Sequence, residues 1–413
     1  MKKIFRKPLL LLRQRWGISS FCLISFLAFL RVLNADITGS YFDLFRKAGL
    51  DLWRGVNPYS AQVGAVQTGH WFYSPSCGMF LFAPLGLLPG HLGVAVYLLL
   101  SWGVFVFGCL EFSSIVLRKP KREVLKLPIV QFFWIAIAPQ MWTAITAEKI
   151  EILSVGLLFF SAAWIIEKKH LGIVALILSM LVNWKYHTVS TVGLLALAWI
   201  FTSGEVALFA WIFCGLVFWY MAPLSFMSWK FFVETQTTWN LDLAEFTHQT
   251  WDSFDNVYAF LRNSLGVKLS YFHGQVLTLI FGLGAVFTQW KHRPGRESVA
   301  YALAIGGWLT ALFSPLSQNN SYILLAPLVW LGILSIAPAD KKWKPLLQYS
   351  TAAYFLVMAL AYSDIVPKPA RDWMRFHSIK PLAGFCYGLL IAIYPLISRR
   401  PLATALETSR PRR

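Results

Sequence analysis

Residues 91–117 read HLGVAVYLLLSWGVFVFGCLEFSSIVL, a stretch in which Glu111 is the one acidic residue and no lysine or arginine occurs. A helix needs about 20 apolar residues to cross roughly 30 Å of hydrocarbon, whereas the strands of a membrane barrel alternate in polarity and are about half as long. Apolar runs of this kind recur along all 413 residues, of which 57% are hydrophobic and 14% charged. The sequence therefore predicts an all-α polytopic membrane protein.

Twelve apolar segments are predicted to span the membrane. The stretch 71–89 is not among them, because its prolines at 75, 84 and 89 suit a broken or interfacial helix better than a straight span. The predicted spans lie near 17–34, 91–117, 128–145, 150–166, 170–184, 187–203, 205–221, 270–289, 298–313, 319–337, 347–364 and 381–398.

The positions of the basic residues support this count. With the N-terminus inside and 71–89 not crossing, the cytoplasmic segments hold 24 of the 37 lysines and arginines. If 71–89 crossed, the basic loop 118–126 would face outward, against the rule that positive charge stays on the cytoplasmic side. We therefore expect a protein of the bacterial inner membrane with both termini cytoplasmic.

The chain is predicted to form one integral membrane domain over residues 1–413. It has a first outer loop at about 35–90 that carries interfacial helices, a second outer loop at 222–269 and a basic cytoplasmic tail at 399–413. The net charge of +18 comes from short basic clusters beside apolar runs, which is typical of a topology signal, so we expect no nucleic-acid partner. The five cysteines have no metal-like spacing, so we expect no cofactor and assign no metal ligand, while the sequence leaves dependence on a divalent metal open.

Two aspartates of the first outer loop are candidate catalytic bases. Asp36 and Asp43 follow the first predicted span, and a carboxylate there could deprotonate an acceptor hydroxyl at the membrane surface. The alternative for each is a helix cap or a solvated charge. After Phe42, apolar residues recur at helical spacing until Gly55–Tyr59, so we expect a surface helix that ends in a turn.

Lys185 is the second unusual residue, since it lies in Asn-Trp-Lys-Tyr-His between two apolar runs. A cation at this depth could bind a lipid phosphate, and the alternative is a lysine that snorkels to the surface. We interpret the neighbouring His187 as a packing or hydrogen-bonding residue. Glu148 and Glu151 could bind a cation, although a solvated pair is the favoured interpretation.

Other outer segments collect acids, amides, hydroxyls and aromatics, as a sugar-handling cleft requires. Each alone is typical of a turn or an interfacial aromatic belt. These segments are Tyr73-Ser-Pro75, Glu148-Lys-Ile-Glu151, His248–Asn256 and Ser314-Pro-Leu-Ser-Gln-Asn-Asn-Ser-Tyr322.

The order of the motifs resembles glycosyltransferase family 87, polytopic bacterial enzymes of the GT-C superfamily that use polyprenyl-phosphate sugars. The resemblance covers residues of about 17–330 and is carried by order and spacing. Its motifs are Ala48-Gly49…Gly55-Val-Asn-Pro-Tyr59, Phe72-Tyr73-Ser-Pro75 leading into Ala83-Pro84-Leu…Pro89, then Lys185, and finally Ser314-Pro-Leu-Ser317…Tyr322…Pro327.

The chain also departs from the family pattern. The family's aspartate aligns without gaps on Tyr41, two residues before Asp43, and Ser74 stands where the family has the first of two prolines. Glu148-Lys-Ile-Glu151 occupies the position where the family has Gly-Gln-x-Asn, and the amide of Asn320 occupies the position of a family histidine. The resemblance is therefore to a divergent member, whose sugar is mannose or another hexose or pentose.

The resemblance implies an inverting transfer of a sugar from a polyprenyl-phosphate donor to an envelope glycolipid or glycan acceptor. It implies Asp43, with Asp36 in reserve, as the base and Lys185 as the partner of the donor phosphate. Two other classes of function remain open, namely a secondary transporter or lipid flippase and a non-enzymatic assembly partner. The candidate substrate contacts are Tyr59, Tyr73, His187, Asn320 and Tyr322.

Overall fold

The computed structural model describes residues 15–60, 73–249, 256–267, 271–292, 295–314, 319–336 and 339–397, and within these ranges every regular element is a helix. The predicted all-α fold is confirmed for this part of the chain. Here four helical stretches are long and apolar enough to cross a membrane, and one bent pair of helices adds a fifth if it is a single span. The four are α2 (Trp16–Leu33), α6 (Gly90–Leu117), α8 (Pro128–Thr146) and α12 (Ala207–Met221) with η3 (Ala222–Ser225), and the bent pair is α19 (Lys368–Phe376) with α20 (Ile379–Ile397).

The other predicted spans coincide with helices that are shorter or less apolar. For example, α10 has 14 residues, so at 1.5 Å per residue it is about 21 Å long, less than the roughly 30 Å of a hydrocarbon core. These helices are α9 (Glu151–Glu167), α10 (Leu171–Trp184), α11 (Val189–Ser203), α15 (Tyr271–His292), α16 (Arg296–Phe313), η4 (Asn319–Leu325) with α17 (Ala326–Ile336), and α18 (Lys344–Leu360).

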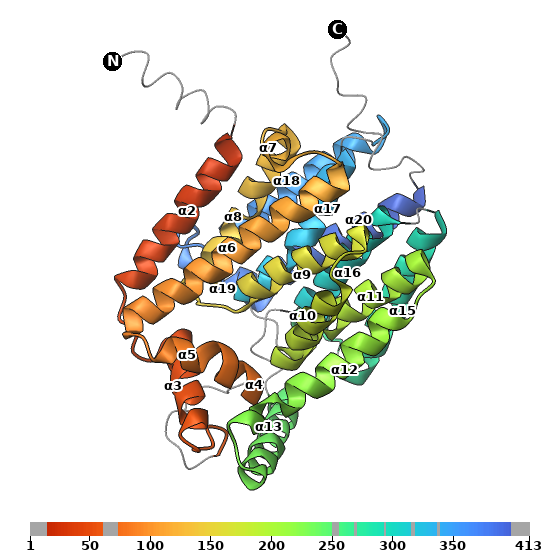
Figure 1. Ribbon diagram of the computed structural model, residues 1–413. Helices are drawn as coiled ribbons and strands as arrows, with labels where there is room; N and C mark the ends of the chain where they lie inside the picture. Colours follow the sequence, from red (N-terminus) through yellow and green to blue (C-terminus); the bar gives the residue numbers. More distant parts are fainter. Residues whose placement is uncertain are drawn as a thin grey trace, which may run out of the picture.

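Two glycines allow a close helix contact between α6 and α9 (Figure 1). A Cβ atom on Gly108 would lie 2.3 Å from the carbonyl oxygen of Gly156, and one on Gly156 would lie 2.6 Å from the backbone nitrogen of Phe105. Small residues at a helix crossing allow the backbones to approach in this way. The start of α9 and its end are therefore held in fixed positions beside α6.

The described parts of the predicted first outer loop, residues 35–60 and 73–89, contain short helices at one end of the bundle, opposite α7 (Lys121–Val124) (Figure 1). α3 (Tyr41–Trp53) begins after the N-cap Ser40 and ends before Gly55, whose φ of +73° favours glycine. The predicted helix and the turn that follows it are confirmed. From residue 73 onward, the predicted broken segment consists of α4 (Pro75–Cys77), the π-helix η1 (Gly78–Phe82) and α5 (Ala83–Gly86).

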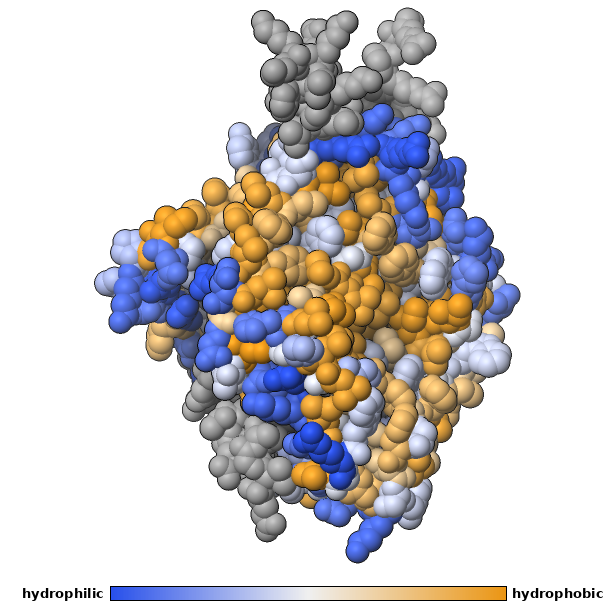
Figure 2. Space-filling model, turned by 60° about the vertical axis from the view of Figure 1, so that its left-hand side comes forward, coloured by the Kyte–Doolittle hydropathy of each residue, from blue (hydrophilic) through white to orange (hydrophobic). Residues whose placement is uncertain are grey.

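The second long loop contains α13 (Trp229–Gln249), at the same end as α3 (Figure 1), and α14 (Val257–Leu265). The predicted basic tail at 399–413 lies outside the described residues. Figure 2 shows a broad apolar area across the middle of one face, with hydrophilic side chains toward its upper and lower ends. This distribution is expected for a surface that contacts lipid in its central part.

Candidate functional site

Asp43 is buried at the first turn of α3 and is held by two cations. Only 2% of its side-chain surface is exposed, and its carboxylate forms ion pairs with Arg46 at 2.8 Å and Lys47 at 2.6 Å. The backbone N–H of Gly39 also donates to it at 3.1 Å. Burial raises the pKa of Asp43, but the hydrogen bonds from Lys47, Gly39 and Arg46 outweigh burial and lower it. The carboxylate is therefore ionised, and a substrate hydroxyl must displace one of these partners to reach it.

Asp36, the other predicted base, has a different position. It is exposed, and its carboxylate accepts a hydrogen bond from the backbone N–H of Thr38 at 2.8 Å. This bond is an Asx turn and not a helix cap, since the N-cap of α3 is Ser40, so the exposed carboxylate matches the alternative of a solvated charge. The structure does not bring Asp36 into the buried group of charges described below.

The turn between α8 and α9 brings Glu148 to the beginning of α3. Glu148 has a φ of +52°, and its carboxylate accepts the backbone N–H of Phe42 at 2.7 Å, across 106 residues of sequence. This N–H belongs to the first turn of a helix, where it has no partner within the helix and attracts negative charge. Burial raises the pKa of Glu148, although the bond from Phe42 partly offsets this effect.

Lys149, which follows Glu148, is also buried, and its ammonium lies 3.7 Å from the centre of the Tyr41 ring. Such a cation–π contact favours the charged form. Burial and the nearby charge of Lys185 nevertheless lower the pKa of Lys149 to about 8, against the charges of Glu151 and Glu148. A lysine of this kind can exchange a proton near neutral pH.

Lys185 forms an ion pair with Glu151, the first residue of α9. Glu151 is fully buried, and the hydroxyl of Ser321 in η4 donates to the same oxygen at 2.7 Å. The interpretation of Glu148 and Glu151 as a solvated pair is therefore wrong, because helix packing encloses both. Lys185 is only 13% exposed, so it points into the protein and does not snorkel to the surface.

The predicted aromatic contacts Tyr59 and Tyr73 lie in the packed core of the first loop. The hydroxyl of Tyr59 donates to the backbone carbonyl of Tyr73 at 2.8 Å, and both residues are 3% exposed. The Lys185 ammonium lies 5.4 Å from the centre of the Tyr73 ring. The two tyrosines thus connect the turn after α3 to the lysine.

His187 lies in η2 (Tyr186–Thr188), between α10 and α11, and is 6% exposed. Neither of its ring nitrogens has a hydrogen-bond partner among the described residues. Buried polar atoms without partners are rare in native proteins and are candidates for contact with a ligand. Tyr322 is buried next to Ser321 in η4, and the side chain of Asn320 lies outside the described residues.

A serine and asparagine contact that the sequence did not indicate joins α4 to α10. Ser74 caps α4, and its hydroxyl donates to the side-chain oxygen of Asn183 at 2.9 Å, while Ser76 contacts the same oxygen. Ser74 stands where the resembling family has proline, and a proline has no hydroxyl for either bond. The serine that departs from the family motif thus takes part in a local hydrogen-bond network that a proline could not form.

The structure thus collects side chains from three loops at one end of the bundle. Glu148, Lys149, Glu151 and Lys185 are enclosed together, with Asp43 beside them at the start of α3. Lys149 was not among the predicted site residues, although its place between two apolar runs was a signal equal to that of Lys185. Such a group can hold an anion on its lysines and accept a proton on its carboxylates. No protein-family model, curated protein or solved structure matches this chain.

Proposed function

We propose that this protein is a membrane glycosyltransferase that moves a sugar, a hexose or pentose such as mannose, from a polyprenyl-phosphate donor to an envelope glycolipid or glycan acceptor. One observation carries the proposal: buried carboxylates and lysines from distant loops meet at one end of an all-helical bundle. The resemblance of the loop motifs to glycosyltransferase family 87 supports the same chemistry.

In the proposed reaction, the acceptor hydroxyl oxygen attacks the anomeric carbon and the bond from that carbon to the phosphate oxygen breaks. The acceptor proton passes to a carboxylate, and the phosphate leaves on its lipid with the bonding electron pair. Asp43 is the proposed base, because it is the buried carboxylate at the start of the first-loop helix. Its ion pairs with Arg46 and Lys47 mean that one of these cations has to move away when it accepts the proton. Lys185 and Lys149 are the proposed partners of the departing phosphate.

The proposal includes the topology that the charge pattern predicts. In this topology the chain has twelve spans, both termini lie in the cytoplasm and the site is on the outer face of the bacterial inner membrane. The charged group would then lie at the lipid surface, where a polyprenyl phosphate is available. The proportion of lysine and arginine in the predicted cytoplasmic segments supports this orientation.

The test is to incubate the purified protein with a panel of polyprenyl-phosphate sugars and an acceptor extract, and to measure the released lipid phosphate. Asp43→Asn is expected to lower the rate by about 10²–10⁴-fold, the usual contribution of a positioned base. Asp36→Asn is the matched control, because Asp36 is exposed and outside the buried group. Transfer at the wild-type rate by a folded Asp43→Asn variant would rule out this role.

A second candidate, a transporter or lipid flippase, is favoured by the burial of Glu151 and Lys185, since ionisable residues inside membrane proteins often mark transport pathways. Uptake of the lipid or sugar into vesicles without release of lipid phosphate would support this candidate. Release of lipid phosphate with a new glycosidic product would support the transferase.

A further inference from the structure

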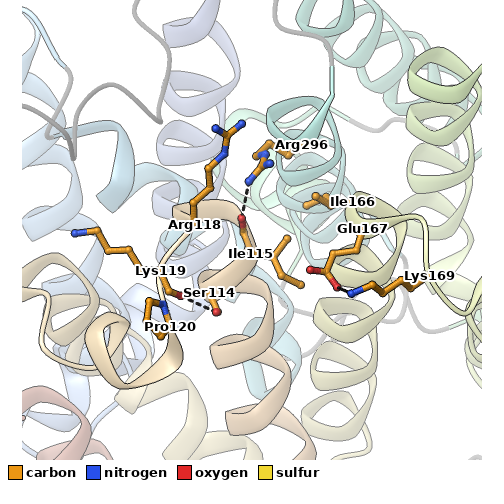
Figure 3. A pocket seen from close by; sticks show the side chains of 9 residues that line it. All are labelled: Ser114, Ile115, Arg118, Lys119, Pro120, Ile166, Glu167, Lys169 and Arg296. Carbon is orange, nitrogen blue, oxygen red and sulfur yellow. Dashed lines mark hydrogen bonds and ion pairs between the residues drawn. The ribbon is translucent and has the colours of Figure 1, made fainter.

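A second charged site lies at the other end of α9 from the candidate active site. A pocket of about 500 Å³ opens where α6 and α9 end and α16 begins, and it is lined by Arg118, Lys119, Lys169 and Arg296 (Figure 3). Glu151 and Glu167 are 16 positions apart in α9, which is about 24 Å of helix. The two sites are therefore distinct, and the pocket has no part in the reaction proposed above.

The pocket has an excess of positive charge. Glu167 is the one acidic residue in its lining, and it forms an ion pair with Lys169 at 3.0 Å. The lining offers no second carboxylate to balance the other three cations, Arg118, Lys119 and Arg296. Arg118 and Arg296 are close enough to repel each other electrostatically. Figure 3 shows their guanidinium groups close together above the end of α6, while Lys119 extends to the other side. Glu167 and the buried Glu297 both attract Arg296 electrostatically.

The two arginines have different roles in the protein itself. Arg296 donates to the backbone carbonyl of Ile115 at 2.8 Å and so caps the end of α6. The side chain of Arg118 has no ion pair or hydrogen bond among the described residues, and its φ of +51° is a conformation that favours glycine. A cation at this helix C-terminus fits both the helix dipole and the charge pattern of the loop, and the Arg118 side chain also lines the pocket, where it can contact a ligand.

We propose that this pocket binds the phosphate of an anionic molecule, with Arg118 and Arg296 as its main contacts. Arginine presents several N–H donors in a plane that matches the oxygens of a phosphate. Basic pockets between the ends of membrane helices are suited to phospholipid head groups, and a soluble phosphate compound offers the same chemistry. The open position of the pocket at the end of the bundle admits either source.

The experiment measures binding of fluorescent phosphatidylglycerol to the full chain in detergent, with phosphatidylcholine as the zwitterionic comparison. Arg118→Gly removes the charge and relieves the backbone, so the variant remains folded with an unchanged or higher melting temperature. We expect it to bind phosphatidylglycerol about fivefold more weakly, the effect of one basic residue near a lipid surface. The matched control is Arg122→Gln, an exposed charge of the same loop that does not line the pocket.

Two competition arms distinguish the sources of the phosphate. Displacement by inorganic phosphate or glycerol 1-phosphate, lost in Arg118→Gly, supports the site with a soluble ligand. Binding of phosphatidylglycerol that neither compound displaces, but that Arg118→Gly weakens, supports the site with a lipid head group. The proposal is overturned if Arg118→Gly binds as the wild type does, or if Arg122→Gln weakens binding equally, because general surface charge then explains the result.

Discussion

The ion pair between Glu151 and Lys185 gives the sharpest test of how the charged group is held together. We consider Glu151→Gln, which keeps the size of the side chain and its contact with Ser321 but removes the charge. Lys185 then stays in a site that is only 13% exposed, without a carboxylate. At about 4 Å and an effective dielectric constant near 20, a pair of unit charges is worth about 4 kcal/mol.

The expected loss of stability follows from the burial of the two partners. Removing one member of a buried pair costs about 3–5 kcal/mol, because the other charge is left without compensation. Since Lys185 keeps some exposure to solvent, we expect about 3 kcal/mol for Glu151→Gln. We expect more for Lys185→Met, which removes the ion pair of the fully buried Glu151 and leaves it the hydrogen bond from Ser321 and the nearby charge of Lys149. The double variant leaves no unpaired charge of this pair and is expected to be more stable than either single variant.

The assay is thermal unfolding of the four proteins in one detergent at one scan rate, since unfolding of such proteins is often irreversible. At roughly 2 °C per kcal/mol, the single variants should melt about 6 °C or more below the wild type. Glu167→Gln is the matched control, because its pair with Lys169 is exposed at the surface and worth less than about 1 kcal/mol. If the double variant melts lower by the sum of the two single effects, the residues are not coupled and the reasoning is refuted.

Three further predictions concern other parts of the chain. Burial lowers the pKa of Lys149 to about 8, so between pH 8 and the ordinary pKa of 10.5 the unfolded chain binds more protons than the folded protein. The free energy of unfolding should therefore rise with pH in this range. The rise should be absent in Lys149→Met, and equal pH profiles of the two proteins would contradict the prediction. Gly156→Ala should destabilise the protein by about 1–3 kcal/mol and lower its melting temperature, because the new Cβ would lie 2.6 Å from the backbone of Phe105. Gly103→Ala is the control, since a Cβ there meets nothing within 4 Å. Equal melting temperatures of the two variants would show that α6 and α9 can separate freely. Gln131→Leu should cost about 1–3 kcal/mol, because its side-chain oxygen accepts two buried or partly buried N–H groups at the start of α2, and an unchanged melting temperature would show that water replaces it.

The amino-acid sequence by itself determined the helices and their order. Apolar runs such as 91–117 are helical whatever their neighbours, since the backbone in lipid has no other way to satisfy its polar groups. Ser40 and Gly55 likewise mark the beginning and end of α3 through local hydrogen bonding and backbone conformation. The prolines of 71–89 divide that stretch into short helices for the same kind of local reason.

Only the tertiary structure decided which charges meet. Glu148 is a neighbour of Glu151 in the sequence, yet it binds the backbone of Phe42 while Glu151 binds Lys185 and Ser321. These contacts join residues 34 to 170 positions apart, and they depend on how close the helices pack. A pattern of residue types carries no record of that packing, so the sequence located the charged loops while the fold determined the partners of each charge.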